Sequence, residues 1–172
     1  MDLTVKNDIP IRLLRASDMR LYAPPQLSTP RVMLELPESK SLRTVVDRLK
    51  LIGDRIKGEA RVCAVRLEAN GTVALRILTP SATIKTFFPN LATPPDFQAE
   101  EDAVVCVRVD SRKLAAGLAA YSLDHDSIVC CPHERRALLL YVTLRDGLGT
   151  ISLYVPTVDD DDYEDDEHHP PE

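Results

Sequence analysis

The sequence is poor in aromatic residues and has no long apolar run. It contains no tryptophan, and aromatic residues make up only 5% of its 172 positions. An aromatic platform for stacking bases or sugars is therefore not indicated. No stretch approaches the roughly 18 apolar residues of a membrane-spanning helix, and no charged-then-apolar leader opens the chain. We expect a soluble intracellular protein with no membrane partner.

Motifs of nucleotide-binding and hydrolytic enzymes are also missing. The sequence has no G-x-x-x-x-G-K-[ST], no G-x-G-x-x-G and no H-E-x-x-H. None of the four histidines has a serine or cysteine near it in a nucleophile context. Asp124, His125 and Asp126 form a compact cluster that is either a solvated turn or a weak metal site, and we favour the turn. We predict that the protein is not an enzyme, with no cofactor and no catalytic or metal-binding residue.

The cysteines show neither a metal-binding nor a disulfide pattern. All four lie inside apolar segments, and none forms a C-x-x-C pair. Neighbours in a strand point to opposite faces, so Cys130 and Cys131 are poorly placed to chelate one ion. We expect Cys63, Cys106, Cys130 and Cys131 to be buried free thiols in a reducing compartment.

The net charge of −6 combines two parts of opposite sign. The acidic segment Asp159–Glu167 and Glu172 together hold nine of the 27 acidic residues and no lysine or arginine. Residues 1–158 then have 18 acids against all 21 bases, a net charge of +3. A mildly basic body is compatible with nucleic-acid binding. Eight like charges in nine positions repel one another, so we predict one domain over 1–158 and a disordered acidic tail over 159–172.

A basic amphipathic helix is predicted over 39–54. Ser39 is a candidate N-cap and Gly53 a candidate stop. Apolar residues recur at helical spacing, at Leu42, Val45, Val46, Leu49 and Ile52. Its polar face includes Lys40, Arg43, Arg48 and Lys50. A solvated face and a phosphate-contacting face are both open interpretations of these cations.

A second helix is predicted directly after the β-branched strand 104–109. Asp110 lies where an N-cap belongs, because its carboxylate can accept from free N–H groups of the first turn. Leu114, Leu118 and Tyr121 form one apolar stripe. The opposite face has two cations and small residues, at Arg112, Lys113, Ala116 and Ala120. This surface would allow a large, negatively charged partner to approach closely.

The remaining segments are predicted to be strands. The segments 61–69 and 72–78 flank Asn70-Gly71, which favours a two-residue type I′ hairpin. A short strand is predicted earlier in the chain, at 31–36, and a third strand follows the hairpin at 82–88. Three later strands are predicted at 127–131, 135–144 and 150–155. Strand, helix and three strands therefore occur twice. This order predicts an α+β fold of two antiparallel sheets with two helices on one side.

Several segments, taken in order, resemble the C-terminal half of the Hus subunit of the 9-1-1 checkpoint clamp, a family similar to proliferating-cell nuclear antigen. They are DIPI, SLRTVVDRLKLI, LEANGTVALRI, TIKTFF with NLATPP, VRVDSRKLAAGLAA and ISLYVPTV, between about Asp8 and Val158. Family members have a further clamp domain before this one. A truncated gene model, a short isoform and a divergent paralogue all remain open.

The resemblance implies a sliding-clamp domain in a non-catalytic subunit of a nuclear, heterotrimeric ring that encircles DNA and supports damage signalling and repair. Its implied partners are two Rad-type clamp subunits, a clamp loader, and double-stranded DNA bound without sequence specificity. The basic residues predicted to face DNA are Lys40, Arg43, Arg48, Lys50, Arg112 and Lys113. The strand predicted to pair with a neighbouring subunit consists of Ala82, Thr83, Ile84, Lys85, Thr86, Phe87 and Phe88.

A different class of function also fits the charge distribution. The domain could be a stand-alone interaction module whose acidic tail binds basic partners such as histones. Binding of DNA with and without residues 159–172, measured at several salt concentrations, separates the two hypotheses.

Overall fold

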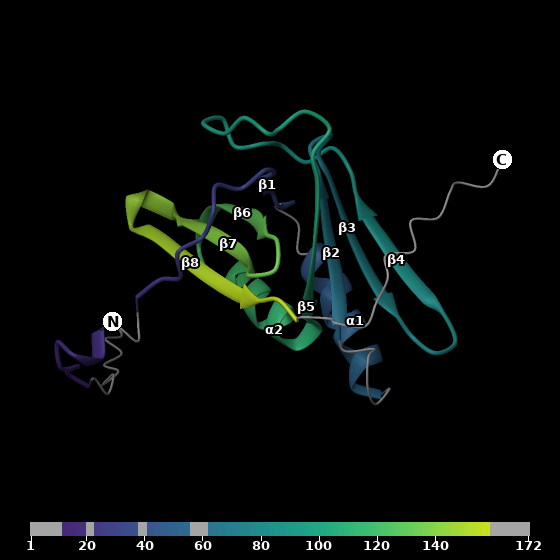
Figure 1. Cartoon of the computed structure of the whole chain (residues 1–172), viewed down its shortest axis with the longest axis horizontal. Helices are drawn as coiled ribbons and strands as arrows, with labels where there is room; N and C mark the ends of the chain where they lie inside the picture. The colour runs from purple at the N-terminus through teal and green to yellow at the C-terminus, as the bar shows by residue number, and fades with distance from the viewer. Residues whose placement is uncertain (1–11, 20–22, 38–40, 56–61, 159–172) are drawn as a thin grey trace, which may run out of the picture.

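The computed structural model describes residues 12–19, 23–37, 41–55 and 62–158 (Figure 1). The predicted N-cap Ser39, the candidate contact residue Lys40 and the acidic tail lie outside these ranges. The elements are β1 Leu34–Glu35, α1 Ser41–Arg55, β2 Val62–Glu68, β3 Thr72–Leu78, β4 Thr83–Phe88, β5 Val104–Asp110, α2 Ser111–Gly117, the 3-10 segment Leu118–Ser122, β6 His125–His133, β7 Ala137–Leu144, the 3-10 turn Arg145–Gly147 and β8 Gly149–Pro156. None of the helices in these ranges is both long and apolar enough to cross a membrane.

Two four-stranded antiparallel sheets form the body of the protein. Their strand orders are β4-β3-β2-β5 and β1-β6-β7-β8. Each repeat of strand, helix and three strands thus contributes its first strand to the sheet of the other repeat. The α1 and α2 helices pack against each other, and Figure 1 shows them between and below the two sheets. The predicted fold class is confirmed.

Residues from both repeats contribute to one hydrophobic core. The strands of the β2–β5 sheet alternate, and Val65, Leu75 and Val107 are among the side chains buried on its inner face. The predicted stripe of α2 is also buried, and the hydroxyl of Tyr121 donates to the carbonyl of Pro37 at 2.9 Å. The apolar period of the sequence therefore identified the inner faces correctly.

The second helix changes geometry halfway along its predicted length. After α2 ends at Gly117, the chain continues as a 3-10 segment, which has about 3.0 residues per turn in place of 3.6. This tighter winding rotates Ala120 inward, so that it is buried, whereas Ala116 remains exposed. The prediction that Ala120 shares the exposed face was wrong for this reason.

The first helix is longer than predicted at its C-terminal end. It runs to Arg55, so Gly53 lies inside it and the predicted stop was wrong. A glycine inside a helix costs only about 1 kcal/mol relative to alanine, which tertiary packing can offset.

The hairpin between β2 and β3 has a three-residue loop. Glu68 pairs with Thr72, and the Gly71 N–H donates to the Glu68 carbonyl at 3.0 Å. A type I′ turn needs positive φ at both central residues, but of Asn70 and Gly71 only Gly71 has one, at 87°. The Asn70 side chain instead donates to Glu68 Oε2 at 2.9 Å. The hairpin is confirmed, and the predicted turn type was wrong.

Candidate nucleic-acid interface and open sheet edge

The cations of α1 lie on two flanks of the helix. Arg43 and Lys50 are seven residues apart, about two turns, so they share a flank beside the buried stripe. Both are half-buried, and Arg43 Nε lies 3.8 Å from Asp47 Oδ2. Arg48 is exposed and lies about 140° further round the helix from Arg43. The structure therefore brings Arg43 and Lys50 together, while Arg48 projects from the other flank.

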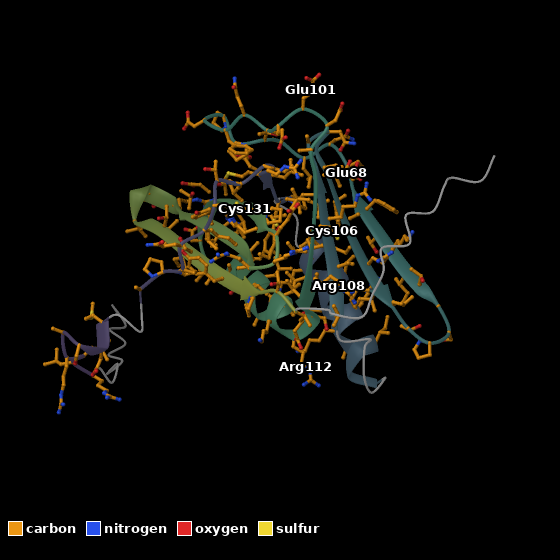
Figure 2. All side chains as sticks on the ribbon, viewed as in Figure 1. Glu68, Glu101, Cys106, Arg108, Arg112 and Cys131 are labelled. Carbon is orange, nitrogen blue, oxygen red and sulfur yellow. The ribbon has the colours of Figure 1, made fainter. Side chains whose placement is uncertain are left out.

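The cations of α2 lie in its first turn. Arg112 and Lys113 are exposed, and their backbone N–H groups donate to Asp110 Oδ1 at 2.8 and 3.2 Å. The predicted N-cap is confirmed. Figure 2 shows Arg112 projecting away from the body of the protein, below the start of the helix.

The helical layer has the features of a non-specific phosphate-binding surface. Because α1 and α2 pack against each other, both sets of cations belong to one layer of the protein. Phosphate contacts carry no sequence information, so cations at loose spacing are sufficient for non-specific attraction. Carboxylates of Asp47 and Asp110 partly offset this charge.

The predicted pairing strand lies at an open edge. In the described part of the chain, β4 pairs with β3 alone, with Ile84 opposite Ile77. Lys85 is exposed in the middle of the strand, and Pro89 follows it. Charged side chains and proline are features that limit uncontrolled pairing of edge strands.

The edge begins one residue later than predicted. Ala82 belongs to a tight turn in which Thr79 N and Ala82 O are 2.9 Å apart and the Thr79 hydroxyl donates to the same carbonyl at 2.8 Å. Ala82 is therefore not part of β4, which begins at Thr83.

A second open edge was missed by the sequence reasoning. Within the part of the chain that the structure describes, β8 ends the other sheet just as β4 ends its own, and each is the last strand of a repeat. The duplicated order of elements was the feature that could have identified this equivalence.

The cysteines divide into two groups. Cys63, Cys130 and Cys131 are buried, and burial raises the pKa of the Cys63 and Cys131 thiols to about 12 and that of Cys130 still further. Cys106 is exposed on β5, so the expectation that all four thiols are buried was wrong. Its position alternates with buried Val105 and Val107, which puts its side chain on the outer face of the sheet.

An arginine contacts the Asp124–Asp126 cluster at the start of β6. Arg145 lies 3.0 Å from Asp124 Oδ1 and 3.6 Å from Asp126 Oδ1, and His125 Nδ1 lies 2.7 Å from the Leu123 carbonyl. Asp124 precedes β6, but His125 and Asp126 are its first two residues, and His125 pairs with Leu144 before an irregularity in the register. The interpretation of the whole cluster as a turn was therefore wrong, because pairing with β7 extends the strand to His125.

One polar hollow of about 350 Å³ lies between the Ser28–Arg31 segment and the end of β6. Arg31 at its rim pairs with Glu100 at 2.6 Å, and buried His133 has its Nε2 3.3 Å from Cys131 Sγ. Burial lowers the pKa of His133 and raises that of Cys131, so both groups favour their neutral forms and are poorly suited to act as an activated pair.

A family model described as Hus1-like protein matches residues 1–159. The chain belongs to this family. It is 32% identical over 153 residues to the checkpoint protein hus1 homolog of Dictyostelium discoideum, covering 88% of this chain and 53% of that protein. Checkpoint protein hus1 of Schizosaccharomyces pombe is 28% identical, with 83% of this chain and 51% of the relative covered. The chain thus spans about half the length of these curated relatives.

Solved structures of sliding clamps have the same fold. A PCNA2–PCNA3 complex from Sulfolobus tokodaii matches 90% of this chain and 53% of its own chain, with a TM-score of 0.56 and 11% identity. The beta subunit of DNA polymerase from Streptococcus pyogenes matches 85% of this chain and 35% of its own, with a TM-score of 0.57 and 11% identity. At this identity the likeness establishes the fold alone.

Proposed function

We propose that this chain acts as part of a non-catalytic checkpoint clamp subunit that surrounds double-stranded DNA in the nucleus. Its role is to provide a scaffold on which damage signalling and repair proteins assemble. Membership of the Hus1-like family and the sliding-clamp fold support this proposal.

The observation that supports it most is the open edge β4. Among the described residues only β3 pairs with β4, so the backbone donors and acceptors on its other side are available to a strand of another subunit. An added strand gains main-chain hydrogen bonds, while side chains select the partner. We assign this edge to pairing with one of two Rad-type clamp subunits, placed around DNA by a clamp loader. The β8 edge is equivalent and is available to a second clamp domain.

Duplex DNA would then contact the helical layer. Arg43 and Lys50 on α1, and Arg112 and Lys113 on α2, supply attraction to phosphates of any sequence. Lys40 is assigned to the same surface from the sequence. Arg48 was predicted to belong to it as well, but it projects from the other flank of α1. The alternative of a stand-alone module that binds histones through the acidic tail remains a hypothesis, and no contact in the described residues favours it.

Two proline variants of β4 test the pairing. In an antiparallel edge strand, N–H groups of successive residues alternate between the neighbouring strand and the open edge. Of Ile84→Pro and Lys85→Pro, one therefore removes a donor to β3 and the other removes a donor from the open edge.

The variant whose circular dichroism spectrum matches the wild type is expected to lose pull-down of the Rad-type neighbour. Lys113→Ala, outside the edge, is the control that should retain it. Retained pull-down by a folded β4 proline variant would show that the subunit interface lies elsewhere.

A further inference from the structure

A row of cations crosses the outer face of the β2–β5 sheet. Arg108 on β5 lies opposite Ala64 on β2, Ala64 lies opposite Arg76 on β3, and Arg76 lies opposite Lys85 on β4. Residues directly opposite on paired strands project from the same face. Sequence neighbours of these residues on β2, β3 and β5 are buried in the core, so the row faces away from the helices. We call Arg108, Arg76 and Lys85 the outer cation row.

The charges of Arg76 and Lys85 are poorly balanced by the surrounding sheet. The neighbouring Arg66 has its own partner, because its Nε lies 3.0 Å from Glu68 Oε1. Within the described residues, no carboxylate lies within 4.0 Å of Arg76 or Lys85, which are both exposed. Like charges directly opposite on paired strands destabilise a sheet. A nearby anion would therefore stabilise this face.

The chain returns to this sheet just before its acidic segment. Thr157 forms an antiparallel bridge with Val109, and the Val158 N–H donates to the carbonyl of Arg108 at 2.8 Å. Asp159 is the next residue, the first of eight acids within Asp159–Glu167. Val158, the residue before the acidic segment, thus lies beside the β5 end of the outer cation row. Figure 2 shows Arg108 on β5, above Arg112 at the start of α2.

The acidic segment is long enough to reach the far end of the row. Four strand spacings of about 4.8 Å separate Val158 from β4, about 19 Å in all. Nine extended residues span about 30 Å. Tethering also gives the segment a high effective concentration at this face, of the order of millimolar for a short flexible link.

We propose that Asp159–Glu167 lies across the outer face of the β2–β5 sheet and neutralises the outer cation row. Each exposed ion pair contributes little to stability, so the attachment depends on several charges acting together. Attraction between the acidic side chains and the cations requires no single backbone conformation of the segment. The proposal is therefore compatible with the prediction that the tail has no regular structure. The segment would screen this face from nucleic acid and other anionic chains, while the cations of α1 and α2 stay accessible.

Zero-length carbodiimide cross-linking of the full-length chain tests the proposal. This reagent joins a lysine amine to a carboxylate in contact with it. At low salt, Lys85 is expected to link to carboxylates of residues 159–167 about fivefold more often than Lys113 does, because only Lys85 lies in the outer cation row. A salt concentration of about 0.5 M should remove most of this difference.

A matched pair of charge reversals keeps both reactive groups intact. Arg76→Glu should lower the Lys85 links about fivefold, since it puts an anion beside Lys85, whereas Arg48→Glu, an equal charge change on α1, should leave them unchanged. Equal linking of Lys85 and Lys113, preferential linking of Lys113, or equal effects of the two reversals would overturn the proposal. In a mixture of isotope-labelled and unlabelled chains, links mainly between different chains would do the same.

Discussion

At the scale of single residues, the geometry of the backbone decides where the side chains of α2 and of the 3-10 segment after it lie. Asp110 caps α2 as expected, because a carboxylate at that position satisfies N–H groups that the helix leaves free. Ala120 was misplaced because the helix tightens into a 3-10 segment after Gly117. Leu118 and Tyr121 are still buried there. The spacing of apolar residues does not reveal the change from α-helix to 3-10 helix, since these positions fit both kinds of helix.

The exposure of Cys106 has a chemical consequence. Thiolate is the reactive form of cysteine, and burial raises the pKa of the Cys63 and Cys131 thiols to about 12. At pH 8 these groups are protonated as well as inaccessible. We predict that one thiol of the native protein reacts quickly with a disulfide reagent such as Ellman's and that the other three react slowly.

The variant Cys106→Ser should remove the fast phase of this reaction, and Cys130→Ser should leave it intact. Two or more fast thiols in the native wild-type protein would contradict the burial of the other three cysteines.

At the scale of elements, the strands were predictable and their connections were less so. The alternation of apolar and polar residues along β2 and β3 defines which side chains face the core. A shift of one residue in the pairing register would expose all of the buried side chains of a strand. The loop geometry depends on a contact distant in sequence, since Leu91 N–H donates to the Gly71 carbonyl at 2.8 Å. No short-range pattern around Asn70 encodes that contact, which explains why the hairpin was predictable and its turn type was not.

Among the loop glycines, replacement of Gly71 is predicted to destabilise the protein most. Its φ is 87°, and a Cβ placed there would lie 2.6 Å from the carbonyl oxygen of Leu91. Gly71→Ala should therefore destabilise the protein by more than about 1 kcal/mol in urea unfolding. Gly147→Ala is the matched control, since its φ is 67° but nothing lies within 4 Å. It tests backbone strain alone, so an equal loss for both variants would show that the close approach to Leu91 is unimportant.

At the scale of the whole molecule, the order of elements predicted two sheets and two helices, because antiparallel strands and amphipathic helices have few ways to bury their apolar faces. The exchange of first strands between repeats was not predictable. β1 is only two residues long, and its place beside β6 depends on tertiary packing. The distribution of charge along the sequence predicted a basic body. The structure adds that the cations of this body lie both on the helices and on the outer face of the β2–β5 sheet.

The salt dependence of duplex binding by the assembled ring tests the central claim most directly. The variant Arg43→Glu with Lys50→Glu reverses two cations of α1. The control Arg135→Glu with Arg136→Glu reverses two cations in the turn between β6 and β7, outside the helical layer. We predict that the first variant binds duplexes of every sequence more weakly, since phosphate contacts do not depend on sequence. Its plot of log K against log salt should also be shallower by about 0.9 for each phosphate that the variant no longer neutralises. The control should retain the wild-type slope. An α1 variant with wild-type affinity and slope, or an equal weakening in the control, would contradict the account that DNA faces the helices.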